Sequence, residues 1–249
     1  MVKTALLLAA GRGIRMGATG RERPKGFIEI GGETLIVRSI GLLLEHGIER
    51  IVAVTGHLSE TYDKLAAEYG GRIQCFLNPN FSSSGSLESL RVGLQQVHEP
   101  FLLLESDIIY QPAVLDALLK SGEENIVAVS GPTHAGDEVY VWARTSPGFA
   151  HSLLLNLSKS RQEQPEEPLG ELVGILKIGT KLRSLLDFKA SQWQKDDPGA
   201  SYETGLVAVA QSFPITCMKL AGLIWAEIDD EQMLEHVRRN VYPRLVAKF

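Results

Sequence analysis

The chain has 249 residues, of which 44% are hydrophobic and 22% are charged, and its formal net charge is −5 at neutral pH. This composition is typical of a globular protein with one large core, and its charge gives no reason to expect nucleic acid or a membrane surface as the main partner. The two cysteines, Cys75 and Cys217, are too few for a disulfide framework or a metal cluster, so we expect free thiols and a cytoplasmic location.

Short apolar strands alternate with amphipathic helices along the first half of the chain. This alternation predicts an α/β fold with a mainly parallel sheet sandwiched by helices. Ligands in such sheets bind beyond the carboxyl ends of the strands, so the loops 11–25, 78–86 and 106–110 should converge there. The expected strands are 4–9, 51–55, 73–77, 101–105 and 126–130, and the expected helices are 34–45, 60–69, 87–97 and 112–119.

The second half of the chain has a less regular pattern. We expect it to extend the same sheet and to form a small mixed lobe. The expected strands are 138–143 and 150–157, joined by a turn at 146–148, followed by 172–178, 215–220 and 223–228; the expected helices are 180–188, 203–211 and 231–239; and the expected polar loops are 162–168 and 192–199.

A glycine-rich segment directly follows the first expected strand. Gly11, Gly13 and Gly17 leave backbone N–H groups open to an anion, because no Cβ blocks a close approach. The segment is also cationic, through Arg12, Arg15, Arg23 and Lys25. This combination suits a polyphosphate.

Two common phosphate-binding motifs do not fit this segment. A P-loop needs a lysine directly after its second glycine, and Ala18 stands there instead. A dinucleotide fingerprint needs its third glycine to open a helix, whereas we expect this loop to continue through Gly20 and Pro24 without becoming helical.

Residues 8–16 (LAAGRGIRM), followed by Pro24-Lys25 and the segment 26–36, resemble the signature of nucleotidyltransferases that join an NTP to a phosphorylated metabolite. This family includes sugar-1-phosphate pyrophosphorylases, molybdopterin guanylyltransferases and choline-phosphate cytidylyltransferases. The resemblance implies a Rossmann-like fold, with a nucleotide-binding half (1–130) and an acceptor-binding half (131–249) in one domain. It implies catalytic roles for Lys25, Arg15 and Asp107. The residues implied to contact the nucleotide are Leu8, Ala10, Gly11, Arg12, Gly13, Lys25, Ser84, Gly85, Ser86 and Ser106.

Two acids at strand ends are candidate metal ligands. Asp107 follows an apolar strand and should point into the ligand crevice, where Mg²⁺ prefers carboxylates and phosphate oxygens. Asp229 ends a late strand, although it could instead cap the next helix, and Glu227 lies on the same strand face as a second candidate. The resemblance implies that Asp107 and Asp229 hold Mg²⁺.

The rest of the chain looks like CTP-dependent phosphocholine and 2-aminoethylphosphonate cytidylyltransferases. The segments that carry this likeness are 129–133, 136–141, 157–159, 170–178, 225–230 and 242–245. Many such enzymes have an Asn-Asn pair after the third strand, where this chain has serines and Gly85. The choice of CTP over another NTP is therefore left open.

A cationic head group on the acceptor needs carboxylates or aromatic faces around it. Lys159 is the candidate for the acceptor phosphate. The candidate acceptor residues are Asp137, Glu138, Tyr140, Lys159, Glu171, Tyr202 and Glu203. An aromatic cage is one hypothesis, although aromatic residues in strands usually belong to the core. Its candidates are Tyr140, Trp142, Trp193, Tyr202 and Trp225.

These observations predict an Mg²⁺-dependent transfer of CMP from CTP to a small phosphorylated or phosphonylated amino alcohol, such as phosphocholine or 2-aminoethylphosphonate, by a monomer or homodimer. Activation of a sugar-1-phosphate or polyol phosphate with another NTP is the enzymatic alternative. A catalytically inactive, nucleotide-sensing relative is the alternative outside enzymes.

Overall fold

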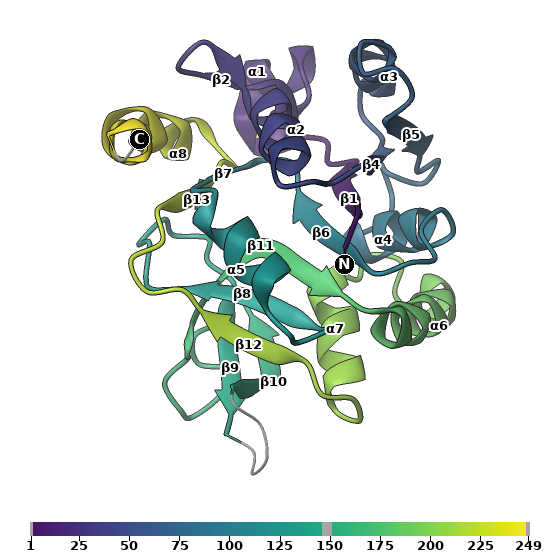
Figure 1. Cartoon of the computed structure of the whole chain (residues 1–249), viewed down its shortest axis with the longest axis vertical. Coiled ribbons are helices and arrows are strands. Elements are labelled where there is room, and N and C mark those ends of the chain that lie inside the picture. Colours follow the sequence, from purple (N-terminus) through teal and green to yellow (C-terminus); the bar gives the residue numbers. More distant parts are fainter. Residues whose placement is uncertain (1, 146–150, 248–249) are drawn as a thin grey trace.

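A nine-stranded sheet forms the centre of the molecule (Figure 1). The computed structural model describes residues 2–145 and 151–247. The strand order is β5-β4-β1-β6-β11-β8-β12-β10-β9, and both halves of the chain contribute strands to it. The bounds are β1 Thr4–Ala9, β4 Arg50–Thr55, β5 Ile73–Leu77, β6 Phe101–Glu105, β8 Ile126–Ser130, β9 Tyr140–Arg144, β10 Ser152–Ser158, β11 Gly170–Ile178 and β12 Thr216–Lys219.

The sheet is mixed, with β10 and β11 running against the other seven strands. The strands expected in the first half are confirmed, but they do not form one continuous parallel sheet. β11 lies between β6 and β8, and its Leu176 pairs with Leu103 on one side and with Val127 on the other. The local sequence of β8 does not reveal this insertion. A strand that is buried on both faces is apolar whether its neighbour is β6 or β11.

Helices cover both faces of the sheet, as predicted. Alternate residues of β1 supply two separate cores: Leu6 and Leu8 face one, and Leu7 faces the other. The first core is covered by α4 (Ser86–Leu94), α6 (Thr180–Asp196) and α7 (Tyr202–Ala210). The second is covered by α2 (Leu35–Glu45), α3 (Ser59–Ala67) and α5 (Ala113–Lys120).

The expectation that the loop 11–25 contains no helix is wrong. A 3₁₀ turn (Ile14–Met16) leads into α1 (Gly17–Glu22), and a second 3₁₀ turn covers Lys25–Phe27. Gly13 and Gly17 have φ angles of 59° and 56°, which glycine adopts at no steric cost, and the turn buries Met16 completely. The segment therefore folds back on itself.

The expected mobile loop 192–199 is also wrong in its first part, because α6 continues to Asp196. Trp193 packs against the core beneath α6, and this contact keeps a polar stretch helical. Asp197 and Pro198 then end the helix. The expected turn at 146–148 lies outside the described residues.

A small C-terminal assembly packs beside the main sheet, where Figure 1 shows α8 next to β7 and β13. The expected strand 223–228 shortens to β13 (Trp225–Glu227), which pairs with β7 (Ile108–Tyr110), a strand absent from the sequence predictions. The hairpin of β2 (Glu29–Ile30) and β3 (Glu33–Thr34) was not predicted either. The expected helix 231–239 divides into α8 (Glu231–His236) and a π-helical turn (Val237–Val241), which α9 (Tyr242–Val246) follows.

The expectation for the cysteines can also be compared with the structure. Cys75 and Cys217 are free thiols, as expected. Within the described residues, every helix is too short or too polar to cross a lipid bilayer.

Gly174 interrupts the regular pairing of β11. Its φ angle is 74°, and the register of β11 against β8 shifts between Leu172 and Leu176. A Cβ atom at this position would collide with Oε2 of Glu105 on the neighbouring strand β6. The bulge therefore makes room for a carboxylate at the end of a buried strand.

We expect the substitution Gly174→Ala to lower the free energy of unfolding by about 1–3 kcal/mol, because it adds left-handed strain and displaces the Glu105 carboxylate. Urea denaturation measures the change. The matched control is Gly41→Ala in the interior of α2, where a Cβ meets no atom within 4 Å. That substitution should raise the stability by about 0.5–1 kcal/mol, and equal effects of the two substitutions would contradict the assignment.

Candidate active site

The three loops that were expected to converge line one cavity of about 240 Å³ at the carboxyl ends of β1 and β6. Among the sequence candidates, the cavity wall includes Leu8, Ala10, Gly11, Lys25, Ser84, Gly85, Ser86, Ser106, Asp107, Tyr202 and Glu203. We call this the nucleotide cavity. Arg12 is exposed outside it, and Gly13 is buried behind Lys25.

The wall of the nucleotide cavity also contains residues that sequence reasoning missed or set aside. They are Ala9, Tyr62, Phe81, Ser89, Glu105 and Glu227. The available signal for Glu105 was its position, because a charged residue ends the apolar run Leu102–Leu104 and lies two residues before Asp107, on the same strand face. Phe81 lies in the loop 78–86 that was expected at this edge, but Tyr62 carries no local signal, because only tertiary packing brings α3 to the cavity.

Lys25 joins two acids that are distant in the sequence. Its Nζ donates to Asp107 Oδ2 at 2.8 Å and also to Asp229 Oδ1. The side chain of Asp229 is only 3% exposed, and those of Lys25 and Asp107 are 15% and 17% exposed. The two predicted metal ligands therefore converge on one point, beside the predicted triphosphate-binding lysine.

The backbone fixes this convergence. Asp107 lies between β6 and β7, and its carbonyl accepts a hydrogen bond from Ile228 N at 2.9 Å. Because Ile228 precedes Asp229, the pairing of β7 with β13 sets the separation of the two carboxylates. Asp230, rather than Asp229, caps α8, since its side chain accepts a hydrogen bond from Met233 N. Asp229 is therefore not used as the helix cap.

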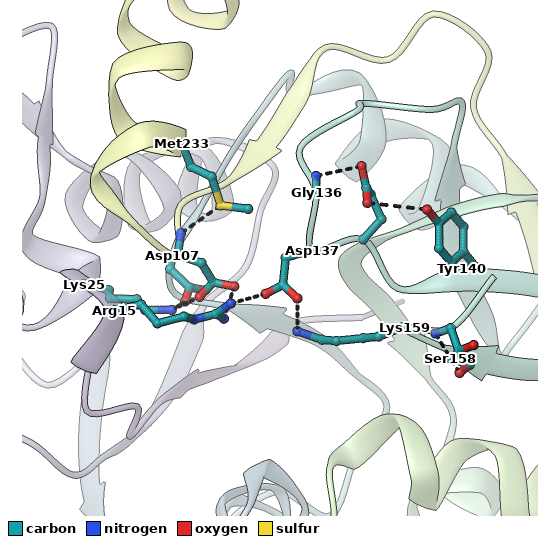
Figure 2. A network of polar contacts seen from close by, with 12 residues as sticks. Arg15, Lys25, Asp107, Gly136, Asp137, Tyr140, Ser158, Lys159 and Met233 are labelled. Carbon is teal, nitrogen blue, oxygen red and sulfur yellow. Dashed lines mark hydrogen bonds and ion pairs between the residues drawn. The ribbon is translucent and has the colours of Figure 1, made fainter. Parts of the chain in front are cut away.

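Arg15 extends the network toward the second half of the chain. Its guanidinium bridges Asp229 Oδ2, at 2.5 Å, and Asp137. Asp137 in turn accepts a hydrogen bond from Lys159 Nζ at 2.8 Å, and Figure 2 shows it between the two cations. One chain of ion pairs thus runs from Asp107 to Lys159.

The cations and carboxylates of this network reinforce each other. Burial alone would lower the pKa of Lys25, but the charges of Asp107 and Asp229 outweigh it and raise that pKa. Burial acts to raise the pKa of Asp229, yet the charge and hydrogen bond of Lys25 hold it below its ordinary value. Both groups are therefore ionised at neutral pH.

A second set of carboxylates lies beside this network and shares Asp107 with it. Carboxylate oxygens of Glu105, Asp107 and Glu227 all lie within 4.8 Å of one another, close enough for one divalent ion. Burial raises the pKa of Glu105 to about 8, and the charge of Asp107 adds to this effect. Tyr202 opposes it by donating a hydrogen bond to Glu105 Oε1 at 2.5 Å. Burial, together with the charge of Glu105, also raises the pKa of Glu227.

A smaller cavity of about 60 Å³ adjoins the nucleotide cavity, and we call it the acceptor cavity. It is lined by four of the predicted acceptor residues, Asp137, Glu138, Lys159 and Glu203. It also shares Glu105, Glu203 and Glu227 with the nucleotide cavity. A ligand in one cavity therefore reaches the other directly.

Two predicted acceptor residues lie elsewhere. Glu171 is buried and accepts hydrogen bonds from the backbone N and the side chain of Thr133, at 2.8 and 2.7 Å, so it anchors the loop after β8. Tyr140 does not line the acceptor cavity. Its ring packs edge-on against Trp142, and the guanidinium of Arg161 covers it at 6.0 Å.

The structure does not bring the five candidate aromatic residues together around one cavity. Trp225 lines the acceptor cavity, Tyr202 lines the nucleotide cavity, and Trp193 faces a third cavity beside Pro198. Trp142 is 1% exposed and donates to the carbonyl of Glu166, so it belongs to the core. Dispersed in this way, the five rings cannot surround one head group.

The serine-rich loop, residues 82–86, is hydrogen-bonded to the segment that leads into α7. Gly85 N donates to the carbonyl of Pro198 at 2.8 Å, and Tyr202 N donates to Ser86 Oγ at 2.9 Å. A Cβ at Gly85 would collide with the backbone of Gly199 and Ala200. Glycine at this position therefore permits contact between two backbones, and Gly85 also lines the nucleotide cavity.

Comparison with known proteins gives a consistent result. Residues 5–172 match the MobA-like NTP transferase domain family. CMP-5'-(3-aminopropyl)phosphonate synthase of Streptomyces rubellomurinus is 36% identical over 130 residues, which are 51% of this chain and 21% of that protein. 2-Aminoethylphosphonate cytidylyltransferase of Lancefieldella rimae is 31% identical over 114 residues, which are 43% of this chain and 46% of that protein. The chain thus spans from about a fifth to half of the length of the curated relatives it matches.

Solved structures share the fold. The inositol-1-phosphate CTP transferase from T. maritima superposes with a TM-score of 0.77 at 18% identity, over 96% of this chain and 98% of that one. The predicted Rossmann-like nucleotidyltransferase fold and the resemblance found in the sequence are both confirmed.

The carboxylate set predicts how stability depends on pH. Because the pKa of Glu105 is about 8 in the folded protein and 4.5 ordinarily, the folded state holds more protons between these values. Stability should therefore fall as the pH rises from about 4.5 to about 8. The substitution Glu105→Gln, which stays neutral, should make this fall less steep.

Urea denaturation in EDTA at several pH values across this range tests the expectation. The exposed Glu68→Gln, which removes one charge far from the site, is the matched control and should keep the wild-type slope. An unchanged slope for Glu105→Gln would show that Glu105 does not titrate in this range.

Proposed function

Because the chain belongs to the MobA-like NTP transferase family, we propose that it is an Mg²⁺-dependent cytidylyltransferase that transfers CMP from CTP to a small phospho- or phosphono-amino alcohol. The observation that carries the proposal is the convergence of Lys25, Asp107 and Asp229 at the nucleotide cavity, whose wall includes Lys25 and Asp107. Relatives named for aminopropylphosphonate and 2-aminoethylphosphonate support the acceptor class.

The reaction brings two anions together. A phosphate or phosphonate oxygen of the acceptor attacks the α-phosphorus of CTP, a new P–O–P linkage forms, and the bond to the β-phosphate breaks to release pyrophosphate. The protein forms no covalent bond in this scheme, so catalysis consists of positioning the reactants and neutralising their charge. Lys25 and Arg15 are the cations placed to neutralise the triphosphate.

The nucleotide would occupy the larger cavity. Residues Leu8–Gly11 present a backbone edge at the end of β1, and Phe81 with the loop 84–86 forms the opposite wall. The acceptor would occupy the smaller cavity, with Lys159 for its phosphate or phosphonate group. Asp137 accepts hydrogen bonds from both Arg15 and Lys159. It therefore sets the distance between the cation that would bind the nucleotide and the cation that would bind the acceptor.

The donor set fits a hard divalent cation, because it consists of carboxylates that converge from two strands. Asp107 and Asp229 would hold Mg²⁺, with Glu227 and Glu105 beside them. Bound there, the ion would supply charge neutralisation at the α-phosphate. Lys25 bridges the same two aspartates and lowers the pKa of Asp229.

A matrix of CTP, UTP, GTP, ATP and dTTP against choline phosphate, 2-aminoethylphosphonate and sugar phosphates tests the proposal, with pyrophosphate release as the readout. We expect turnover with CTP and an amino-alcohol acceptor, abolished by EDTA and restored by Mg²⁺. Turnover with a sugar phosphate alone would support the other enzymatic class. Tight nucleotide binding without turnover on any acceptor would identify a nucleotide sensor.

The substitution Lys25→Ala should reduce kcat/KM for CTP by about 10²-fold or more, since a preorganised charge at the reacting phosphates is lost. The effect on the KM of the acceptor should be much smaller. Lys64→Ala, which removes an exposed lysine of α3, controls for charge. A dominant effect on the acceptor would assign Lys25 to the other substrate.

A further inference from the structure

One buried carboxylate oxygen at the junction of the two cavities has no partner. Glu203 Oε2 is inaccessible to solvent and accepts no hydrogen bond from the described part of the chain. Buried polar atoms are nearly always paired in folded proteins, so an exception in a ligand cavity points to a donor that the ligand brings. Glu203 lines both the nucleotide cavity and the acceptor cavity.

The position of Glu203 is fixed by its neighbours. It lies in the first turn of α7, directly after Tyr202, whose N donates to Ser86 Oγ and whose hydroxyl donates to Glu105. These two hydrogen bonds fix the first turn of α7 beside the two cavities. These contacts fix the backbone from which the Glu203 side chain extends.

The nearby cations are committed to other acids. Lys25 pairs with Asp107 and Asp229, and Lys159 pairs with Asp137. Glu105, Glu203 and Glu227 line both cavities, and within the described residues none of the three forms an ion pair. Together they make an acidic junction between the cavities. Such a junction attracts a positive group.

The acceptor cavity also contains one cation among its described lining residues. Lys159 lines the same small cavity and is close enough for its charge to act on Glu203. A short zwitterion matches this arrangement, with its phosphonate or phosphate toward Lys159 and its ammonium toward Glu203. The small volume of this cavity, about 60 Å³, favours a short linker between the two charged groups.

The chemistry of the cavity distinguishes between two kinds of ammonium group. A quaternary ammonium has no N–H and is recognised through aromatic faces, of which the acceptor cavity offers only that of Trp225 among its described lining residues. The indole N–H of Trp225 is itself bound to Ser130 Oγ at 2.7 Å. A primary ammonium offers three N–H donors and satisfies a carboxylate directly.

We propose that Glu203 binds the ammonium group of the acceptor and that this group is a primary amine, so that the substrate is a short ω-aminoalkyl phosphonate or phosphate and not a quaternary one. This inference rests on the proposed function. It assigns Glu203 as a specificity-determining residue and selects one of the two acceptor classes that the proposed function admits.

The test is a graded acceptor series with CTP and wild-type protein: 2-aminoethylphosphonate, its N-methyl, N,N-dimethyl and N,N,N-trimethyl forms, and propylphosphonate, which lacks the amine. We expect kcat/KM to fall along the series, by about 10²-fold or more for the trimethyl and amine-free compounds, because they leave Glu203 unpaired. Equal use of the primary and trimethyl compounds overturns the inference and leaves the proposed function intact. No turnover with any acceptor overturns the proposed function itself.

The substitution Glu203→Gln separates amine recognition from other roles. It should raise the acceptor KM by about 10-fold or more and flatten the methylation series, while leaving the KM for CTP near wild type. Glu203→Asp, which keeps the charge, should retain part of the preference for the primary amine, and Glu68→Gln controls for charge. A change in the Mg²⁺ requirement of Glu203→Gln with an unchanged acceptor KM would assign Glu203 to metal binding and overturn the inference.

Discussion

The candidate site depends on one lysine held between two aspartates. Lys25 comes from the turn after α1, Asp107 from the end of β6, and Asp229 from the residues after β13, so three distant segments meet at a single ammonium. Hydrophobic burial places β1 beside β6, but only the short pairing of β7 with β13 brings the third segment to the site. The charges then favour what the backbone has arranged, because each carboxylate of the pair stabilises the ammonium.

The buried glutamates beside this lysine lower the stability of the fold. Glu105, Glu203 and Glu227 are withdrawn from water and repel one another, and their pKa values are raised by that burial. A protein selected for stability alone would place apolar or paired groups there. The left-handed Gly174 is a second such feature, since an ordinary strand residue would exclude the Glu105 carboxylate. Features of this kind gather where a ligand supplies the missing partner.

Local pattern was sufficient to predict most strands and several functional residues. The apolar runs gave β1, β5, β6 and β8 with their observed bounds, and strand-end reasoning with the family resemblance placed Lys25, Asp107 and Asp229 at one edge. The order of the strands could not be predicted, because β11 inserts between β6 and β8 through contacts far apart in the sequence. Glu105 was missed although its position at the end of an apolar strand was a signal, and its contacts with Gly174 and Tyr202 come from other elements. Trp193 similarly extended α6 beyond the end that the polar sequence suggested.

The attachment of the serine-rich loop to the start of α7 bears on how such proteins diversify. Gly85 N donates a hydrogen bond to the carbonyl of Pro198, and Ser86 Oγ accepts one from Tyr202 N. The two segments therefore pack directly against each other. Grafting either segment alone from a homologue would leave mismatched backbones facing each other. Recombination among relatives should therefore preserve the two stretches as a linked pair, even though more than a hundred residues separate them along the chain.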